Sequence, residues 1–290
     1  MDRHRAITLQ RDKGIMAFTC VTYNIQFGIG IDGRYDLDRI ADAVRDADVI
    51  LLQEVTRGYI QNNGVDMVAE IRARMPDRFS AVALPVDIDF GSGLRDGVAV
   101  EQRFRFGNMV LSRWPLVTVR RHLLPRTMRH GRLNLQRGAL EALVDTPDGP
   151  VRFISTHLDH VDANERLAQI AALRGIVFGY AAEGGAATGL REFGFPELPV
   201  AERVMIGGDF NMHPGSFEHT AMAGSGETRL IDVSPPGDVM SFHNPAQDEE
   251  PLQRLDYLFA DPVLAERVER TWIDEDAVGS DHRPVWVEVG

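Results

Sequence analysis

The sequence contains almost no cysteine and almost no lysine. Cys20 is the only cysteine among the 290 residues, which excludes a disulfide within the chain and a zinc site built from cysteines. Because Cys20 lies in the alternating segment 18–24, we expect it to be an ordinary buried residue. Lys13 is the only lysine. Every other fixed cation is therefore an arginine, the side chain that binds phosphate in a bidentate manner.

Long hydrophobic runs are also missing. No stretch approaches the ~18 consecutive apolar residues that a membrane-spanning helix needs. The charged N-terminus lacks the apolar core of a secretory signal. Residues 1–15 are therefore expected to be a disordered extension or the product of an upstream start, and residues 16–290 a single domain. A single cysteine and no signal favour a cytoplasmic location.

Acidic residues are absent from one segment of an otherwise acidic chain. Residues 102–140 contain nine arginines and no Asp or Glu, which leaves −21 for the rest of a chain whose net charge is −12. Such a chain is a poor match for a long nucleic-acid backbone. The segment is either a solvated edge hairpin or a binding surface for a phosphate. Within it, Arg126, Arg129 and Arg132 form a loop that could fold over a bound anion.

Short strand-like segments dominate the hydropathy pattern. They lie at residues 18–25, 49–53, 107–112, 138–144, 151–156, 204–207, 255–260 and 285–289. Amphipathic helical periodicity is found at residues 37–45, 66–74 and 164–180. Strands mixed with a few helices predict an α/β fold in which helices cover the sheets.

Polar residues that can bind a metal or a phosphate lie in or beside six of these strands. In chain order they are Asn24, Glu54, His157, Asp209, Asn211, Asp256, Asp281 and His282. Loops at strand ends are where rigid scaffolds place chemistry. Each residue alone also fits an ordinary role, such as a turn for Asn24 or an exposed carboxylate for Glu54. Their combination in this order predicts a functional site.

Two of these positions carry a further physical argument. Gly207 and Gly208 let the backbone turn sharply before Asp209 and Asn211, which lie on the same side of an extended segment. Asp256 lies inside an apolar strand, where an unpaired carboxylate costs several kcal/mol or more. Asp256 therefore needs a partner.

The polar residues belong to motifs that are recognisable as a set. The segments are TYNIQFG, LLQEV, FGNMVLSRWP, QRGAL, STHLDH, GGDFNMHPGS, RLDYLF and GSDHRPV, from Thr22 to Val285. The sequence resembles the endonuclease/exonuclease/phosphatase superfamily, which includes pancreatic-type deoxyribonucleases, apurinic endonucleases, neutral sphingomyelinases and inositol polyphosphate 5-phosphatases. FGNMVLSRWP and QRGAL are most similar to its bacterial metal-dependent hydrolases. The dimetal calcineurin-type phosphoesterases do not match, because they need an early Asp-x-His where this chain has Asn24-Ile25-Gln26.

The resemblance implies a fold and a set of site residues. The fold is a four-layer αββα sandwich of two packed mixed β-sheets flanked by helices, formed by one catalytic domain over residues 16–290. The implied catalytic residues are Asp209, Asn211, His157, His282 and Asp256, the phosphate-binding residues Arg137, Asn108 and His282, and the metal ligands Glu54, Asn24 and Asp281. Oxygen ligands without cysteine favour Mg²⁺ or Mn²⁺.

The resemblance also implies how these residues would act. Asp209 would position and deprotonate a water molecule, and Asn211 would hold a phosphoryl oxygen or the nucleophile. His282 would contact the phosphate while Asp256 fixes its orientation. His157 would stabilise the charge of the transition state or assist the leaving group.

The sequence therefore predicts a phosphodiester hydrolase that uses metal-assisted in-line attack of water. A lipid headgroup or a small metabolite is the expected substrate, because the acidic remainder of the chain would repel a long polyanion. An endo- or exonuclease acting on DNA or RNA is the alternative, and a non-catalytic binding module on the same fold is a third possibility. Phe193 and Phe195, in a later loop, either add an apolar wall to the site or pack on the sandwich. The sequence does not define an oligomeric state.

Overall fold

The computed structural model describes residues 17–244 and 252–290, and within them two mixed sheets of six strands each. The expectation for residues 1–15 lies outside the described residues. The first sheet has the order β15-β16-β1-β2-β6-β3, formed by Val268–Ile273, Val285–Val289, Phe18–Asn24, Val49–Arg57, Arg103–Ser112 and Phe79–Asp89. The second has the order β11-β14-β10-β9-β8-β7, formed by Ile231–Asp232, Asp256–Ala260, Val204–Asp209, Gly149–His157, Gly138–Thr146 and Leu116–Leu123.

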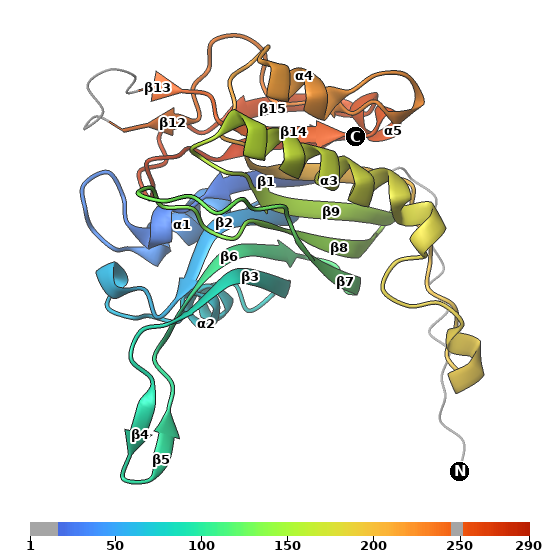
Figure 1. The fold of residues 1–290 in the computed structure, drawn as a ribbon. Helices are drawn as coiled ribbons and strands as arrows, with labels where there is room; N and C mark the ends of the chain where they lie inside the picture. Colours follow the sequence, from blue (N-terminus) through green and yellow to red (C-terminus); the bar gives the residue numbers. More distant parts are fainter. Residues whose placement is uncertain (1–16, 245–251) are drawn as a thin grey trace.

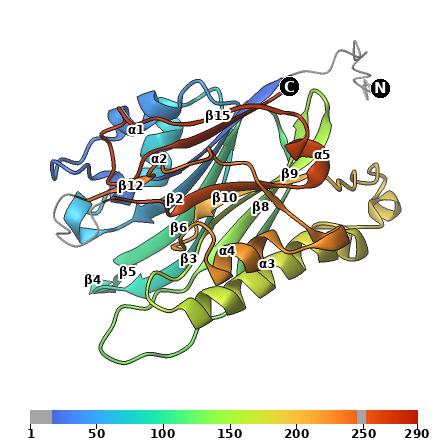
Figure 2. The same ribbon diagram turned by 90° about the horizontal axis from the view of Figure 1, so that it is seen from above.

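The two sheets pack face to face, and helices cover their outer faces (Figures 1 and 2). The covering helices are α1 (Leu37–Val44) and α2 (Met67–Arg74) on the first sheet and α3 (Ala163–Glu183) and α4 (Phe217–Ala223) on the second. The short α5 (Pro262–Ala265) follows β14 and packs Leu264 into the core between the sheets. Alternation along each strand produces the layers: in β1, Cys20 packs between the sheets, whereas Tyr23 packs beneath α1 and α2. The predicted αββα sandwich and the buried position of Cys20 are confirmed. Within the described ranges, no helix is long and apolar enough to cross a bilayer.

A parallel strand pair lies at the centre of each sheet. β1 pairs with β2 in the first sheet and β9 with β10 in the second, while the other neighbours in both sheets are antiparallel. In each pair a helix connects the two strands, α1 in the first and α3 in the second. The carboxyl ends of these four strands converge at one edge of the sandwich, where polar loop residues can meet.

A small polar network joins the two sheets just below this edge. The Gln53 Nε2 donates to Ser155 Oγ at 3.0 Å and to Thr22 Oγ1 at 3.2 Å, and Ser155 Oγ donates to the backbone of Leu52 at 3.0 Å. All three polar side chains are fully buried. The network therefore fixes how β2 of one sheet lies against β9 of the other.

Two small ribbons extend the sandwich. β4 (Gly93–Arg95) and β5 (Val98–Val100) form a hairpin that projects from the ends of β3 and β6 (Figure 1). Its tip is Asp96-Gly97, both with positive φ, the sequence that two-residue hairpin turns favour. β12 (Phe242–His243) pairs with β13 (Leu252–Gln253) near the convergent edge.

The outer face of the second sheet holds a buried ion cluster beneath α3. Glu141 lies 2.7 Å from both Arg120 Nε and Arg152 Nε, and 3.0 Å from His122 Nε2. Burial alone would raise the pKa of Glu141, but hydrogen bonds from His122 and Arg120 and the charge of Arg152 outweigh it and lower the pKa to about 2.

Replacing Glu141 with glutamine is expected to destabilise the protein by ~3–5 kcal/mol at pH 7, because Arg152 would remain as an uncompensated buried charge. Since the folded pKa is depressed, the stability that Glu141 provides is present above about pH 4.5 and is lost as the pH falls toward 2. Urea unfolding at several pH values measures this. Asp42→Asn, which removes an exposed ion pair with Arg45, is the control and should cost under ~1 kcal/mol. Equal losses in the two variants would contradict the prediction.

Candidate active site

A cleft of about 400 Å³ opens where the carboxyl ends of the parallel strands converge. Its polar lining is Glu54, Arg137, His157, His160, Asp209, Asn211, Gln253 and His282, and its apolar lining is Phe27, Phe106, Leu133, Leu135, Phe242 and Leu255. Most of the predicted site residues thus meet at one cleft although they are far apart in the sequence.

Glu54 enters the cleft through an irregularity in β2. The pairing of β2 with β6 shifts register between Leu52 and Val55, and Glu54 between them has φ 62°. A non-glycine residue in the left-handed region is strained, and such strain gathers at functional sites. The bulge re-aims the carboxylate from the strand into the cleft. Burial raises the pKa of Glu54 to about 7, an effect that His282 opposes and Asp281 reinforces.

The first strand supplies an amide between two carboxylates. The Asn24 Nδ2 lies 3.3 Å from Glu54 Oε1 and 3.0 Å from Asp209 Oδ2. The Gln26 Nε2 donates to Asp281 Oδ2 at 2.7 Å and so orients that carboxylate on the same side. Gln26 was not predicted as a site residue. Its place in the TYNIQFG motif, two residues after Asn24, was the available signal.

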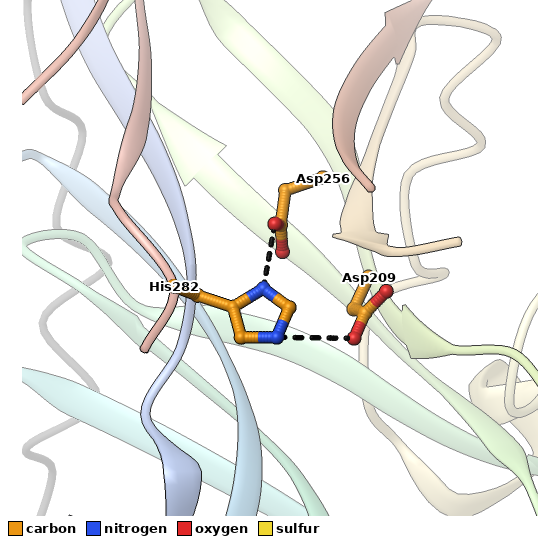
Figure 3. Close-up of side chains that lie close together, drawn as sticks. All are labelled: Asp209, Asp256 and His282. Carbon is orange, nitrogen blue, oxygen red and sulfur yellow. Dashed lines mark hydrogen bonds and ion pairs between the residues drawn. The ribbon is translucent and has the colours of Figure 1, made fainter. Parts of the chain in front are cut away.

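His282 and Asp256 form a buried pair (Figure 3). The distance between His282 Nδ1 and Asp256 Oδ2 is 2.7 Å, and His282 Nε2 lies 3.7 Å from Asp209 Oδ2. Burial alone would lower the pKa of His282, but the charges of Asp256 and Asp209 outweigh it and raise the pKa to about 10. His282 is therefore a cation at neutral pH, and Asp256 has the partner that the sequence demanded.

Ser241, which was not predicted as a site residue, holds this pair. The fully buried Ser241 Oγ donates to Asp256 Oδ2 at 2.7 Å and accepts from the backbone N–H groups of Leu255 and Asp256, both at 3.0 Å. Ser241 thus fixes the carboxylate that fixes His282. No local pattern marks this residue, because its contact spans a loop and depends on the tertiary fold.

Asp256→Asn is expected to lower the pKa of His282 strongly in the metal-free protein, because the variant removes the largest contribution that raises it. The pKa of His282, about 10 in the wild-type protein, should then fall to its ordinary value of 6.5 or lower, so that the imidazole loses its charge at a lower pH. Histidine NMR titration measures this. Asp232→Asn is the matched control, since Asp232 pairs with His219 at 3.0 Å outside the cleft. An unchanged His282 titration would contradict the assignment.

His157 and Asn211 lie beside Asp209. The His157 Nε2 lies 3.3 Å from Asp209 Oδ2, and burial together with Arg137 holds the pKa of His157 well below its usual value. Asn211 has φ 49°, and its backbone N–H donates to Asp209 Oδ1 at 3.0 Å. The sharp turn that the sequence predicts after Gly207 and Gly208 is therefore part of the site, since it holds the side chains of Asp209 and Asn211 at the cleft.

Arg137 is a buried cation in the wall of the cleft. It is 3% exposed and forms no ion pair within the described ranges, while its Nη2 lies 3.1 Å from His160 Nδ1. Its Nε and Nη1 have no hydrogen-bond partner in that part of the chain. A buried guanidinium that forms no ion pair and lies beside a cleft is suited to an anionic ligand. His160, an exposed residue, also lines the cleft.

The other arginines of the cationic segment are mostly neutralised by neighbours. Arg129, expected in a loop over a bound anion, instead pairs with Asp162 at 2.8 Å and Glu165 at 3.2 Å. Asn108, expected in the pocket, lies behind it, where its Nδ2 donates to the backbone of Gly138 at 2.9 Å and of Ser155 at 3.3 Å. Asn108 thus joins the sheets and is not among the residues that line the cleft.

The donors around the cleft fit a divalent cation. Ligand atoms of Asp209, Asp256 and His282 lie within 4.8 Å of one another and could bind a metal. However, Asp256 and His282 already hydrogen-bond to each other, which favours a proton-holding pair over two ligands. Glu54, Asn24 and Asp281 provide further oxygen donors: Asn24 lies between Glu54 and Asp209, and Asp281 Oδ1 lies 4.0 Å from His282 Nε2. Burial raises the pKa of Glu54, and the charges of His282 and Arg137 offset that rise only in part, so a bound cation would stabilise the carboxylate further.

Fold and cleft together define an αββα sandwich protein with a carboxylate- and histidine-lined site at the edge where its sheets meet. The chain belongs to the endonuclease/exonuclease/phosphatase family, whose model matches residues 21–282. It is a hydrolase of that superfamily, whose members act on phosphoesters.

Solved structures share the fold at low sequence identity. An endonuclease/exonuclease/phosphatase protein of Beutenbergia cavernae is 21% identical, with a TM-score of 0.68 over 94% of this chain and 71% of that one. Sphingomyelinase C of Streptomyces griseocarneus is 18% identical, with a TM-score of 0.58 over 95% and 100%. A mannosyl-6-phosphatase of Bacteroides thetaiotaomicron is 16% identical, with a TM-score of 0.58 over 94% and 99%. No curated protein sequence is significantly similar to the chain.

Proposed function

We propose that the protein is a phosphodiesterase that depends on Mg²⁺ or Mn²⁺ and acts on a small or lipid-borne phosphodiester. The observation that supports this most directly is the buried Arg137, which forms no ion pair within the described ranges, in the same cleft as the carboxylates of Glu54 and Asp209 and the cationic His282. The carboxylates suit a metal, and the two cations suit the oxygens of a phosphoryl group.

The formal charges of the site favour a diester over a monoester. Four carboxylates, from Glu54, Asp209, Asp256 and Asp281, face the two cations Arg137 and His282, which leaves a formal charge of −2. A single divalent cation makes the site neutral. A phosphodiester then adds one negative charge and a monoester adds two, and each uncompensated charge is costly in a partly buried site.

In this mechanism, the residues position the water and balance charge. Glu54, Asn24 and Asp281 would hold the cation, which when bound offsets negative charge on the phosphoryl oxygens. Asp209 accepts a proton from the attacking water as the new P–O bond forms. The P–O bond to the leaving oxygen breaks in line with the attack, and that oxygen takes a proton from solvent to leave as an alcohol. His282 and Arg137 contact the non-bridging oxygens.

The surface charges weigh against a nuclease. A nuclease gains most of its affinity by neutralising successive phosphates along a groove. In the cationic segment, however, Arg103 and Arg105 pair with Asp87, Arg113 with Asp48 and Arg120 with Glu141. These ion pairs leave less free positive charge for a polyanion than the sequence suggests.

A panel of phosphoesters assayed with Mg²⁺, Mn²⁺ and EDTA tests the proposal. Bis(p-nitrophenyl) phosphate should be hydrolysed faster than p-nitrophenyl phosphate, and only with metal. Lipid-headgroup diesters and supercoiled plasmid complete the panel. Plasmid nicking faster than any small diester would favour the nuclease. Absence of turnover with every substrate and metal would favour the binding module.

A further inference from the structure

Phe27, in the wall of the cleft, has an unfavourable backbone conformation. Its φ and ψ are 57° and 17°, between Gln26 at φ 40° and Gly28 at φ 79°. Glycine adopts this region freely, but a bulky aromatic residue does so only where its surroundings impose it. A residue that served only to complete a turn would be a glycine or an asparagine.

Specific contacts impose this conformation. The fully buried Asn62 donates from Nδ2 to the backbone oxygen of Phe27 at 3.2 Å and to Thr56 Oγ1 at 3.1 Å. On the other side, the Gly28 N–H donates to the backbone of Ile25 at 2.7 Å. The strained residue is therefore held in place, and its half-buried ring is directed to the cleft.

The ring belongs to an aromatic ladder that runs outward from the site. Its members, with ring centroids 4.5–6.0 Å apart along the ladder, are Phe106, Phe27, Tyr59, Phe104 and Phe90. Phe106 lies 6.0 Å from the ring of His157, whereas Phe90 at the outer end is 52% exposed. Leu133 and Leu135 add apolar surface on the cleft lining. Phe104 and Phe106 are buried, so within the ladder it is the half-buried Phe27 that presents a ring at the cleft wall, backed by a packed aromatic cluster.

We propose that Phe27 is a specificity-determining residue that seats a planar apolar group of the substrate, next to the phosphate. The inference depends on the phosphodiesterase function proposed above and narrows its substrate class. Aromatic rings gain from offset or edge-to-face contact with another planar group beyond what burial alone provides. Simple aryl groups and nucleobases share this chemistry.

Calorimetric titration with phenyl-, cyclohexyl- and methylphosphonate in the presence of Mg²⁺ tests the inference without turnover. Phenylphosphonate is expected to bind at least ~10-fold more tightly than methylphosphonate and more tightly than cyclohexylphosphonate of similar size. Thymidine 5′-phosphate as a fourth ligand distinguishes a nucleobase from a simple aryl group. Equal affinity for the phenyl and cyclohexyl compounds would overturn the inference.

Phe27→Gly isolates the ring, because glycine adopts the same φ without strain. This variant should lose the preference for phenyl over methyl while its affinity for methylphosphonate stays near wild type. Phe27→Tyr keeps the ring and should keep the preference. Asp96→Gly, at another left-handed position in the distant hairpin turn, should change neither.

The outcomes separate the two proposals. If the Phe27→Gly variant keeps the preference for the phenyl compound, the ring has no selective role. The same conclusion follows if its affinity for every ligand falls by the same factor. An intact phenyl preference without any turnover would overturn the phosphodiesterase function and leave the planar-group site. If no phosphonate binds in the presence of metal although diesters are hydrolysed, the planar-group inference alone fails; if diesters are not hydrolysed either, both proposals fail.

Discussion

Asp209→Asn is expected to lower kcat by at least ~10²-fold, the scale of lost general-base assistance. The substitution keeps the size of the side chain, and an amide oxygen can still accept the N–H of Asn211, now 3.0 Å from Asp209 Oδ1. The turn should therefore persist while the proton acceptor is lost. Steady-state kinetics with saturating metal, together with thermal unfolding of the metal-free protein, measure both effects.

The control for this variant is Asp232→Asn, which alters a partly buried aspartate of the same sheet outside the cleft. Its kcat should remain near the wild-type value. A large loss of stability in metal-free Asp209→Asn would show that Asp209 serves the turn and not the chemistry. A kcat close to wild type would remove Asp209 from the mechanism.

Chelation is expected to abolish turnover, and Mg²⁺ or Mn²⁺ to restore it.

Glu54→Gln should raise the metal concentration needed for half-maximal binding by at least ~10-fold, since loss of even an outer-shell partner has an effect of that size. Burial raises the pKa of Glu54 to about 7, so protons compete with the metal below that pH. Wild-type affinity should therefore rise between pH 6 and 8, and Glu54→Gln should lose much of that dependence.

Calorimetric metal titrations at these pH values measure the effect. Glu101→Gln is the control, because its side chain is 72% exposed and lies away from the cleft lining. Full activity of demonstrably metal-free protein would contradict the mechanism. Equal metal affinity in wild type and Glu54→Gln would assign the ligand role elsewhere, with Asp209, Asp256 and His282 as the next candidates.

Hydropathy predicted the interior strands of both large sheets and none of their edges. The eight predicted strands correspond to β1, β2, β6, β8, β9, β10, β14 and β16, whereas β3, β7, β11 and β15 end the sheets. An edge strand has one neighbour and more contact with water, so it tolerates charge and proline. β3 accordingly contains Pro85, and β7 contains Arg120 and Arg121. Their apolar periodicity was too weak to recognise.

The same physics determines which parts of the site could be predicted. Glu54, Asp209 and His282 are polar residues at the ends of strongly apolar strands, so their positions stand out in the sequence. Gln26 lies in a short 3₁₀ turn and Ser241 in a loop, and their partners Asp281 and Asp256 are brought to them only by the fold. The ion pairs that neutralise Arg129 depend in the same way on the approach of α3 to a distant loop.

The pairing of β1 with β16 also has a consequence for synthesis of the protein. Residues near the two ends of the described chain are neighbours in the first sheet, with Phe18 opposite Val289. Asp281 and His282 lie just before β16, so they reach the cleft only when that strand docks beside β1. On the ribosome, the second sheet can therefore begin to assemble while the first still lacks an inner strand. The group of residues at the cleft is completed late, after residues 285–289 have emerged, and a nascent chain has no complete cleft until then.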